Sequence, residues 1–214
     1  MAELVAKNRI KELRRMQTRE LFFAAASELI VEKGVGGISM EEIAQKAGYA
    51  KGSIYNYFSG KDKFVCEMVR HSMDRMNATL AGIFADEGSS YASRLDRIYA
   101  VLFAQIKDSL VVMREIDHFF LNHGKYQKTV KAAATQLVDT IAEFFAKGIR
   151  EGTIVSVDPQ LTAMMFLHIA TIIRDCRMLD LIEPDEERCE RFYRAFRNGL
   201  LKSAEGRKEN ASDE

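Results

Sequence analysis

The amino-acid sequence predicts an all-α protein, and three observations carry this prediction. Apolar residues recur at intervals of three and four along most of the 214 residues, which is the period of one helix face. Only two prolines, Pro159 and Pro184, occur in the chain, whereas a turn-rich β fold uses many. No internal repeat, low-complexity tract or parallel-strand pattern is present. We therefore expect about nine helices, arranged as a three-helix N-terminal domain and a larger C-terminal helical domain.

The N-terminal domain is predicted to contain an amphipathic helix, "RELFFAAASELIVEK", at 19–33. The glycines of "GVGG" at 34–37 end it, because glycine adopts the left-handed conformation that closes a helix. A second, short helix starts at Ser39, whose hydroxyl can accept from the first turn while Glu42 reaches back as in a capping box. Gly48 ends this helix, and "YA" leaves room only for a tight turn. The inward-facing apolar residues of the two helices are Phe22, Ala25, Ala26, Leu29, Ile30, Ile43, Ala44 and Ala47.

A third helix is predicted over "KGSIYNYF" at 51–58, and its outer face is unusual. At 100° per residue, Ile54 and Phe58 define the buried side. Two short helices joined by a glycine turn form a helix-turn-helix, in which the second helix enters the DNA major groove. Lys51 and Lys61 lie at predicted helix N-termini, where the helix dipole disfavours cations, so an external anion such as phosphate is expected. The opposite, polar and aromatic side carries Gly52, Ser53, Tyr55 and Asn56, with Tyr57 and Lys51 at its edges.

Charge is distributed unevenly, although the formal net charge is zero. Residues 1–19 contain six basic and two acidic side chains. A basic segment beside a helix-turn-helix favours nucleic-acid binding. On charge alone, a solvated helix start explains it equally well.

The segment "ISMEEIAQKAGYAKGSIYNYFSGKDKF" resembles the DNA-binding region of the TetR (tetracycline-repressor-like) family of bacterial transcriptional regulators. The match covers about residues 16–65 and departs at Ala50, where the family often has a serine or threonine cap. The resemblance assigns the phosphate backbone to Ser39, Ser53, Tyr55, Tyr57 and Lys61. It places Met40, Glu41, Lys51, Gly52 and Asn56 nearest the base edges. In the alternative interpretation, the tyrosines, and Tyr57 above all, cover the edge of the domain's own core.

The remaining sequence predicts six further helices. They cover the stretch from Lys61 to Phe84, a fifth helix around 95–106, a shorter one at 109–122, a long one from Val130 to near Gly152, and two more at 159–181 and 184–204. "EGSS" at 87–90 is a predicted loop, and Asp158 is the expected cap before Pro159. We expect a helix-turn-helix domain at 1–62, a ligand-binding and dimerisation domain at 63–206 and a disordered tail at 207–214.

Isolated histidines lie on apolar stripes of the larger domain. A polar group on such a stripe is usually a satisfied core residue. The other interpretation is a pocket for a mainly apolar small-molecule effector, with the polar groups fixing its orientation. The candidate ligand-binding residues are Phe120, His123, Met164, His168 and Asp175. No metal site is expected, since nothing in the spacing of His123, His168 and Asp175 requires them to converge.

The helix predicted at 159–181 is apolar nearly all the way round, so its own domain cannot cover every face. The resemblance implies that the last two helices pair with those of a second subunit as a four-helix bundle. The candidate interface residues are Phe166, Ile173, Phe192 and Phe196. A two-fold homodimer would present two recognition helices to a palindromic operator.

Several protein classes are disfavoured by features that the sequence lacks. No glycine-rich phosphate loop, HExxH motif or nucleophile elbow occurs, so we expect neither an enzyme nor a bound cofactor. No signal peptide or bilayer-length apolar run is present, and three scattered cysteines indicate reduced thiols. We therefore expect a cytoplasmic protein that does not bind membranes and lies on the bacterial nucleoid when bound to DNA.

The function expected from these features is ligand-responsive, sequence-specific regulation of transcription, as a repressor released from a double-stranded DNA operator by a small molecule. The alternative is an all-helical small-molecule-binding protein or enzyme whose N-terminal module no longer reads DNA. The intact polar and basic face of "KGSIYNYFSGK" favours the first, because the alternative has no need of it.

Overall fold

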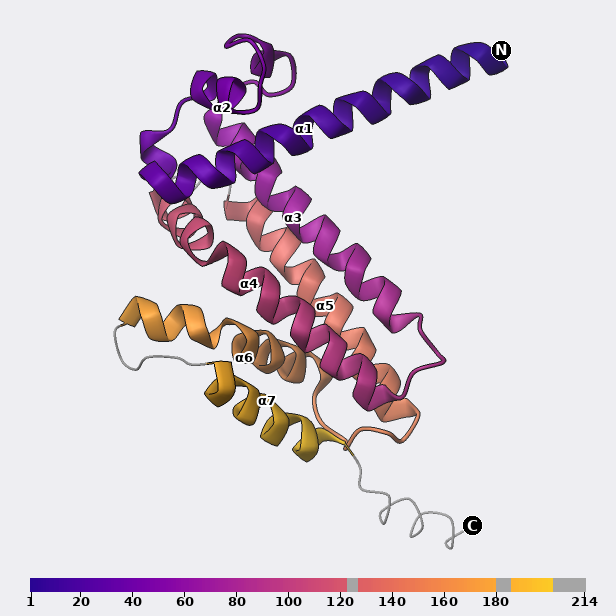
Figure 1. Ribbon diagram of the computed structural model, residues 1–214. Helices are drawn as coiled ribbons and strands as arrows, with labels where there is room; N and C mark the ends of the chain where they lie inside the picture. The colour runs from indigo at the N-terminus through magenta and orange to yellow at the C-terminus, as the bar shows by residue number, and fades with distance from the viewer. Residues whose placement is uncertain (123–126, 180–185, 202–214) are drawn as a thin grey trace, which may run out of the picture. The chain divides into compact units, whose positions relative to one another are not determined.

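The computed structural model of the protein describes residues 1–122, 127–179 and 186–201, with the backbone alone for several helical residues among them (Figure 1). These residues are almost entirely helical, as the sequence predicts. Within them lie seven α-helices and one short 3-10 helix. Their bounds are α1 Ala2–Gly37, α2 Met40–Lys46, η1 Ser53–Asn56, α3 Lys61–Phe84, α4 Tyr91–Asn122, α5 Gln127–Arg150, α6 Pro159–Leu179 and α7 Glu186–Leu200.

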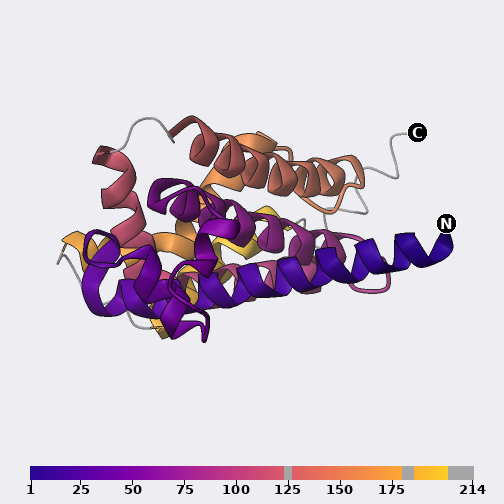
Figure 2. The same cartoon turned by 90° about the horizontal axis from the view of Figure 1, so that it is seen from above.

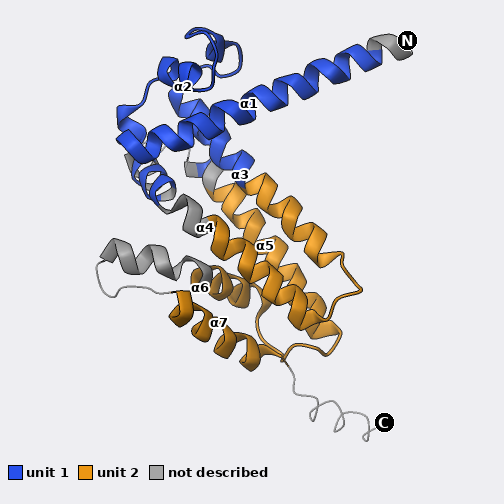
Figure 3. Cartoon of the chain, in the orientation of Figure 1, with its two compact units in different colours: residues 1–72, 111–130 blue, residues 73–110, 131–214 orange. Residues whose placement is uncertain are grey.

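The helices group into two compact units (Figure 3). Unit 1 contains residues 1–72 and 111–130, and unit 2 contains residues 73–110 and 131–214. Helices α3, α4 and α5 each contribute residues to both units. The domain limits expected from the sequence, 1–62 and 63–206, stay predictions, and the expected tail at 207–214 lies outside the described residues.

Unit 1 has an apolar core built from helix faces that the sequence predicts. Phe22 and Ile30 of α1 are fully buried, together with Ile43 of α2 and Ile54 of η1. Aromatic rings fill the centre: the ring centroids of Phe23 and Phe64 lie 5.4 Å apart, and those of Phe58 and Phe64 lie 4.8 Å apart. Burying a side chain of this size contributes roughly 1.5–3 kcal/mol, so these contacts hold the three N-terminal elements together.

Helix α1 is much longer than the helix expected over 19–33. It starts at Ala2 and has 36 residues, and its first turns extend beyond the other segments of unit 1 (Figure 2). Residues 2–18 contain no glycine or proline and are mostly strong helix formers, which allows the helix to begin early. Gly34 interrupts the helical geometry with φ of 70°, where the sequence predicts the end of the helix.

Two further expectations about helices need correction. The helices expected at 95–106 and 109–122 are one continuous helix, α4, because no glycine or proline separates them. The helix expected over 51–58 is a single 3-10 turn at Ser53–Asn56. Gly52 precedes it without a side-chain cap, and the Ser53 hydroxyl donates to the carbonyl of Ala50 at 2.7 Å. A serine hydroxyl that bonds to nearby backbone competes with the hydrogen bonds of a regular helix, and a glycine also disfavours an α-helix.

Unit 2 is centred on aromatic side chains from α4, α5, α6 and α7. Phe145 and Phe166 are fully buried, with ring centroids 5.7 Å apart. The rings of Tyr99 and Tyr193 stack at 3.8 Å, with planes 1° apart. Helix α6 begins as expected at Pro159, and Asp158 caps it by accepting from the backbone N–H of Leu161 at 2.6 Å.

Candidate nucleic-acid interface

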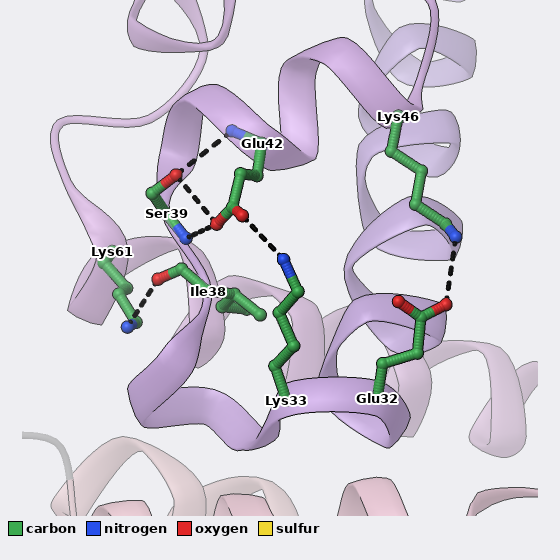
Figure 4. Close-up of polar contacts among 7 residues, drawn as sticks. All are labelled: Glu32, Lys33, Ile38, Ser39, Glu42, Lys46 and Lys61. Carbon is green, nitrogen blue, oxygen red and sulfur yellow. Dashed lines mark hydrogen bonds and ion pairs between the residues drawn. The ribbon is translucent and has the colours of Figure 1, made fainter.

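The capping box at the start of α2 fixes the first half of the helix-turn-helix (Figure 4). The backbone N–H of Glu42 donates to the Ser39 hydroxyl oxygen at 3.2 Å, and the backbone N–H of Ser39 donates to Oε2 of Glu42 at 2.9 Å. The ammonium of Lys33 donates to the other carboxylate oxygen of Glu42 at 2.7 Å. The bond from Lys33, followed by those from Ser39, lowers the pKa of Glu42 to about 2. The carboxylate therefore stays ionised and ties α2 to α1.

The opposite end of α2 is also held against α1. The Lys46 ammonium lies 2.9 Å from Oε2 of Glu28 and 3.4 Å from Oε1 of Glu32. Gly48 follows with φ of 83°, which lets the backbone N–H of Tyr49 return to the carbonyl of Ala44 at 2.9 Å. The turn that leads into η1 is therefore set by glycine geometry, as the sequence predicts.

Four residues form an exposed surface around η1, which we call the recognition surface: Lys51, Gly52, Tyr55 and Asn56. They are exposed because Ile54 and Phe58, on the opposite side, are buried in the core of unit 1. A side chain added at Gly52 would meet no atom within 4 Å, so this glycine keeps one part of the surface open for close approach of a partner.

Glu41 and Tyr55 are bonded to each other beside the recognition surface. The Tyr55 hydroxyl donates to Oε1 of Glu41 at 2.7 Å. This bond lowers the pKa of Glu41 and raises the pKa of Tyr55. The phenol that is predicted to hold a DNA phosphate therefore has an acceptor within its own chain.

Lys61 also has partners within unit 1. Its ammonium donates to the carbonyl of Ile38 at 2.8 Å (Figure 4). It also donates to the carbonyl of Gly36 at 3.0 Å. The position of Lys61 at the start of a helix predicts an external anion, because a cation there opposes the helix dipole. The structure supplies the cation with carbonyls from the end of α1 and the following residue instead. Partial burial lowers the pKa of Lys61.

Two residues expected at the DNA lie at or near the core. Met40, expected near the base edges, is buried in the core of unit 1 and cannot reach a base. Tyr57 is half-buried, and its ring packs edge-on against Phe22 with centroids 5.5 Å apart. This contact corresponds to the alternative in which Tyr57 covers the core. Ser39 and Ser53 are also half-buried, and their hydroxyls are bonded within the chain.

The N-terminal turns of α1 border the recognition surface, although none of their residues is among the DNA contacts that the sequence predicts. A groove of about 510 Å³ lies between α1 and η1, and Lys11, Arg14 and Arg15 line it beside Asn56 and Tyr57. The excess of basic residues at 1–19 is a signal that could have placed them there. Charge alone did not distinguish a nucleic-acid-binding segment from a solvated helix start, because charge does not determine which way the side chains face.

Of the residues expected to bind an effector, the structure describes the side chains of two, Met164 and His168, and both are exposed. Met164 and His168 lie on an exposed stripe of α6 together with Leu161 and Met165. His123 and the side chains of Phe120 and Asp175 lie outside the described residues. Within the part of the chain that is described, no group of three histidine, cysteine or acidic residues could hold a metal ion.

The residues expected at a dimer interface differ in exposure. Phe166 is fully buried in the core of unit 2, against Phe145 and Tyr193, so it offers no surface to another subunit. Phe192 is 55% exposed and Phe196 is half-buried. The side chain of Ile173 lies outside the described residues.

None of the helices in the described ranges is long and apolar enough to cross a membrane.

Comparison with known proteins identifies the helix-turn-helix. Residues 22–68 match the family of bacterial regulatory proteins named the tetR family. The chain is 25% identical over 169 residues to the HTH-type transcriptional regulator YwcC of Bacillus subtilis, covering 71% of this chain and 72% of that one. It is 26% identical over 111 residues to the HTH-type transcriptional repressor KstR2 of Mycobacterium tuberculosis, covering 52% of this chain and 50% of that protein.

The fold agrees with solved structures. A transcriptional regulator of the TetR/AcrR family from Thermobifida fusca superposes with a TM-score of 0.63 at 22% identity, covering 88% of this chain and 99% of that chain. The matched residues contain the capping box, the glycine turn and the whole recognition surface. Residues 22–68 therefore carry the helix-turn-helix of the tetR family of bacterial regulatory proteins, and the chain is similar over most of its length to helix-turn-helix regulators of transcription.

Proposed function

We propose that the protein is a homodimeric repressor that binds a palindromic operator and leaves it when a small molecule binds unit 2. It acts by binding, without catalysis. The observation that carries the proposal is the recognition surface, where Tyr55 and Asn56 of η1 and Lys51 of the preceding turn are exposed, while the other side of η1 is fixed by core packing. An exposed lysine, phenol and amide beside a glycine suit the phosphates and base edges of a major groove.

An exposed apolar stripe supports the dimer. Leu161, Met164 and Met165 of α6 are 58%, 48% and 50% exposed, and their spacing places them on one face. Phe192 of α7 adds a large apolar side chain. Clustered apolar residues of this size are typical of surfaces that a partner covers. A two-fold dimer would present two recognition surfaces about one DNA turn apart, or a multiple of it.

A groove in unit 2 supports the response to a small molecule. It has a volume of about 690 Å³, between α4 and α7, and its lining includes Tyr99, Phe103 and Tyr193. The Tyr193 hydroxyl donates to Oδ1 of Asp96 at 2.7 Å. The buried Tyr99 hydroxyl has no hydrogen-bond partner among the described residues. A mainly apolar effector would pack along these aromatic side chains, and a bond to the buried Tyr99 hydroxyl would require the Tyr99 ring to move.

Both phenols are neutral donors at ordinary pH. Burial raises the pKa of Tyr99, and burial followed by the bond to Asp96 raises the pKa of Tyr193. This site differs from the one expected from the sequence, which relied on His168 and Met164. Those two residues belong to the exposed stripe that we assign to the dimer.

Selection of DNA from a random-sequence duplex library tests the DNA part of the proposal. We expect an enriched inverted repeat, bound by the parent protein with an affinity that falls steeply with salt. Asn56→Ala should reduce discrimination between the enriched and random duplexes, whereas Asn77→Ala, in α3 of unit 2, should not. Failure to enrich any duplex would favour the alternative, a small-molecule-binding protein whose N-terminal module no longer reads DNA.

The groove is tested by filling it. Ala100 lines the groove and is exposed, so Ala100→Trp should occupy its volume without disturbing the core. Fluorescence of the dye anilinonaphthalene sulfonate should report binding to the parent protein and a several-fold loss in Ala100→Trp. His168→Phe is the comparison, and unchanged dye binding is expected there. Equal dye binding by Ala100→Trp and the parent would rule out this groove.

A further inference from the structure

The first turns of α1 are a feature of this chain that the family match does not include. The match begins at residue 22, whereas α1 begins at Ala2. Every residue from Val5 to Gln17 is exposed, so the side chains of about three helical turns are not packed into the core of unit 1. A helix that projects from its core (Figures 1 and 2) in this way is available to a partner.

Basic residues are concentrated on one face of this projecting helix. Lys7, Lys11, Arg14 and Arg15 are spaced by four, three and one, which places them within one third of the circumference. Arg9 is two residues from both Lys7 and Lys11, so it points to the opposite side, about 200° around the helix. We call the four residues the basic face of α1.

The basic face is continuous with the recognition surface. Its four residues line the groove between α1 and η1, whose other wall includes Asn56 and Tyr57. The guanidinium of Arg15 lies 5.7 Å from the centre of the Tyr57 ring, which anchors this end of the face to the helix-turn-helix. A polyanion seated on Asn56 would therefore meet these cations next.

We propose that the basic face of α1 is a second DNA contact, which binds phosphates adjacent to those held by the recognition surface. The proposal rests on the proposed function. From Lys7 to Arg15 the helix rises about 12 Å, at about 1.5 Å per residue. One DNA strand carries a phosphate every 3.4 Å or so along its axis, so this length matches about three or four phosphates. The contact is to the backbone and adds affinity without sequence preference.

An anionic membrane surface would also attract basic residues, but the other side of the helix argues against it. Leu13 and Met16 are exposed there, and Arg9 lies between them around the helix. Insertion of that side into a bilayer would carry Arg9 with it, and burying an unpaired charge is costly. The observations therefore favour duplex DNA.

The experiment compares two arginines of the same helix in the full-length protein. Arg14→Ala removes a cation of the basic face, and Arg9→Ala removes the same charge from the opposite side. Alanine favours helix, so circular dichroism should show both variants folded like the parent. Anisotropy titrations use the enriched duplex and a random-sequence duplex, each between about 50 and 200 mM salt.

We expect Arg14→Ala to weaken binding to both duplexes roughly fivefold to tenfold per contact at about 0.1 M salt, and to reduce the slope of log K against log salt by about 0.9 per contact. Lys11→Ala should behave alike, and Arg9→Ala should stay within twofold of the parent. Trimming base pairs that flank the inverted repeat should cost the parent more affinity than it costs the double variant Lys11→Ala with Arg14→Ala.

Each result decides a different question. If the parent binds no duplex, the proposed function itself fails. If the parent binds but Arg14→Ala and Lys11→Ala match Arg9→Ala in affinity and slope, the basic face is not a DNA contact and the proposed function stands. Vesicles of phosphatidylcholine with phosphatidylserine are the second probe. Loss of vesicle binding with unchanged duplex binding in these variants would assign the face to a membrane surface and overturn the inference.

Discussion

The phenol of Tyr55 and the carboxylate of Glu41 are joined by a 2.7 Å hydrogen bond, although the two residues are 14 positions apart. The bond links α2 to η1 across the turn of the helix-turn-helix. It also holds a negative charge at the edge of a surface that we expect to meet a polyanion. To reach a phosphate, Tyr55 has to exchange its carboxylate acceptor for a phosphate oxygen.

Glu41→Gln should therefore tighten duplex binding. The substitution removes the negative charge while leaving an oxygen that Tyr55 can still use, and the gain should be larger at low salt because exposed charges are screened within about 10 Å at 0.1 M. Glu32→Gln, which removes a charge from the α1 side of unit 1, is the control. Weaker binding by Glu41→Gln would show that the carboxylate makes a favourable contact, such as accepting from a cytosine amino group.

Lys61→Ala should lower the free energy of unfolding by about 1 kcal/mol, because it deletes the two bonds to the carbonyls of Gly36 and Ile38 at a partly exposed site. Lys63→Ala is matched in charge and removes only an i,i+4 pair between an exposed lysine and the half-buried Glu67, so it should cost less than about 0.5 kcal/mol. Denaturant titration measures both. If both variants lose the same free energy of unfolding, the bonds from Lys61 to the two carbonyls contribute no more to stability than a surface charge does. Any effect of Lys61→Ala on duplex binding has to be measured well below its melting temperature.

Ser39→Ala should destabilise unit 1 by about 1 kcal/mol, the usual contribution of a serine cap. Denaturant unfolding followed by circular dichroism measures the change. Ser27→Ala is the control, since Ser27 lies within α1 and bonds only the carbonyl of Phe23 one turn earlier. A loss equal to that of the control would mean that the capping box does not set the start of α2.

The pH dependence of stability should report Glu42. Its folded pKa of about 2 lies below the ordinary value of 4.5, so the ionised form is the one that stabilises the fold. This stabilisation is complete above pH 4.5 and declines as the pH falls toward 2. The difference in stability between the parent and Glu42→Gln should therefore narrow through that window. A difference that stays constant from pH 7 to 3 would contradict the lowered pKa.

Phe192→Asp should produce folded monomers, whereas Phe166→Asp should unfold unit 2. Phe192 is 55% exposed in the single chain, and Phe166 is fully buried, where an unpaired charge is costly. Light scattering after size exclusion measures the mass, and circular dichroism measures the helix content. Met165→Asp tests the α6 stripe in the same way. Dimers that persist in both exposed-site variants would place the subunit contact elsewhere.

The local rules of helix formation determined much of this protein from its sequence. The buried positions of α1 and α2, the capping box at Ser39, the turn at Gly48 and the start of α6 at Pro159 all follow from residues within one or two turns of each other. Helical period, caps and positive-φ glycines act over such short distances that no knowledge of the tertiary structure is needed.

Only the tertiary structure decided which groups the polar and apolar side chains contact. Tyr55 bonds Glu41, and Lys61 bonds carbonyls 25 and 23 positions earlier, so two residues expected to face only DNA also hold the unit together. Phe166 and Phe192 have the same side chain, yet one is core and the other is surface. The helical spacing of apolar residues in the sequence identifies the apolar face of a helix. Only the packing of the other helices decides how much of that face is covered, because burial depends on neighbours that are distant in the sequence.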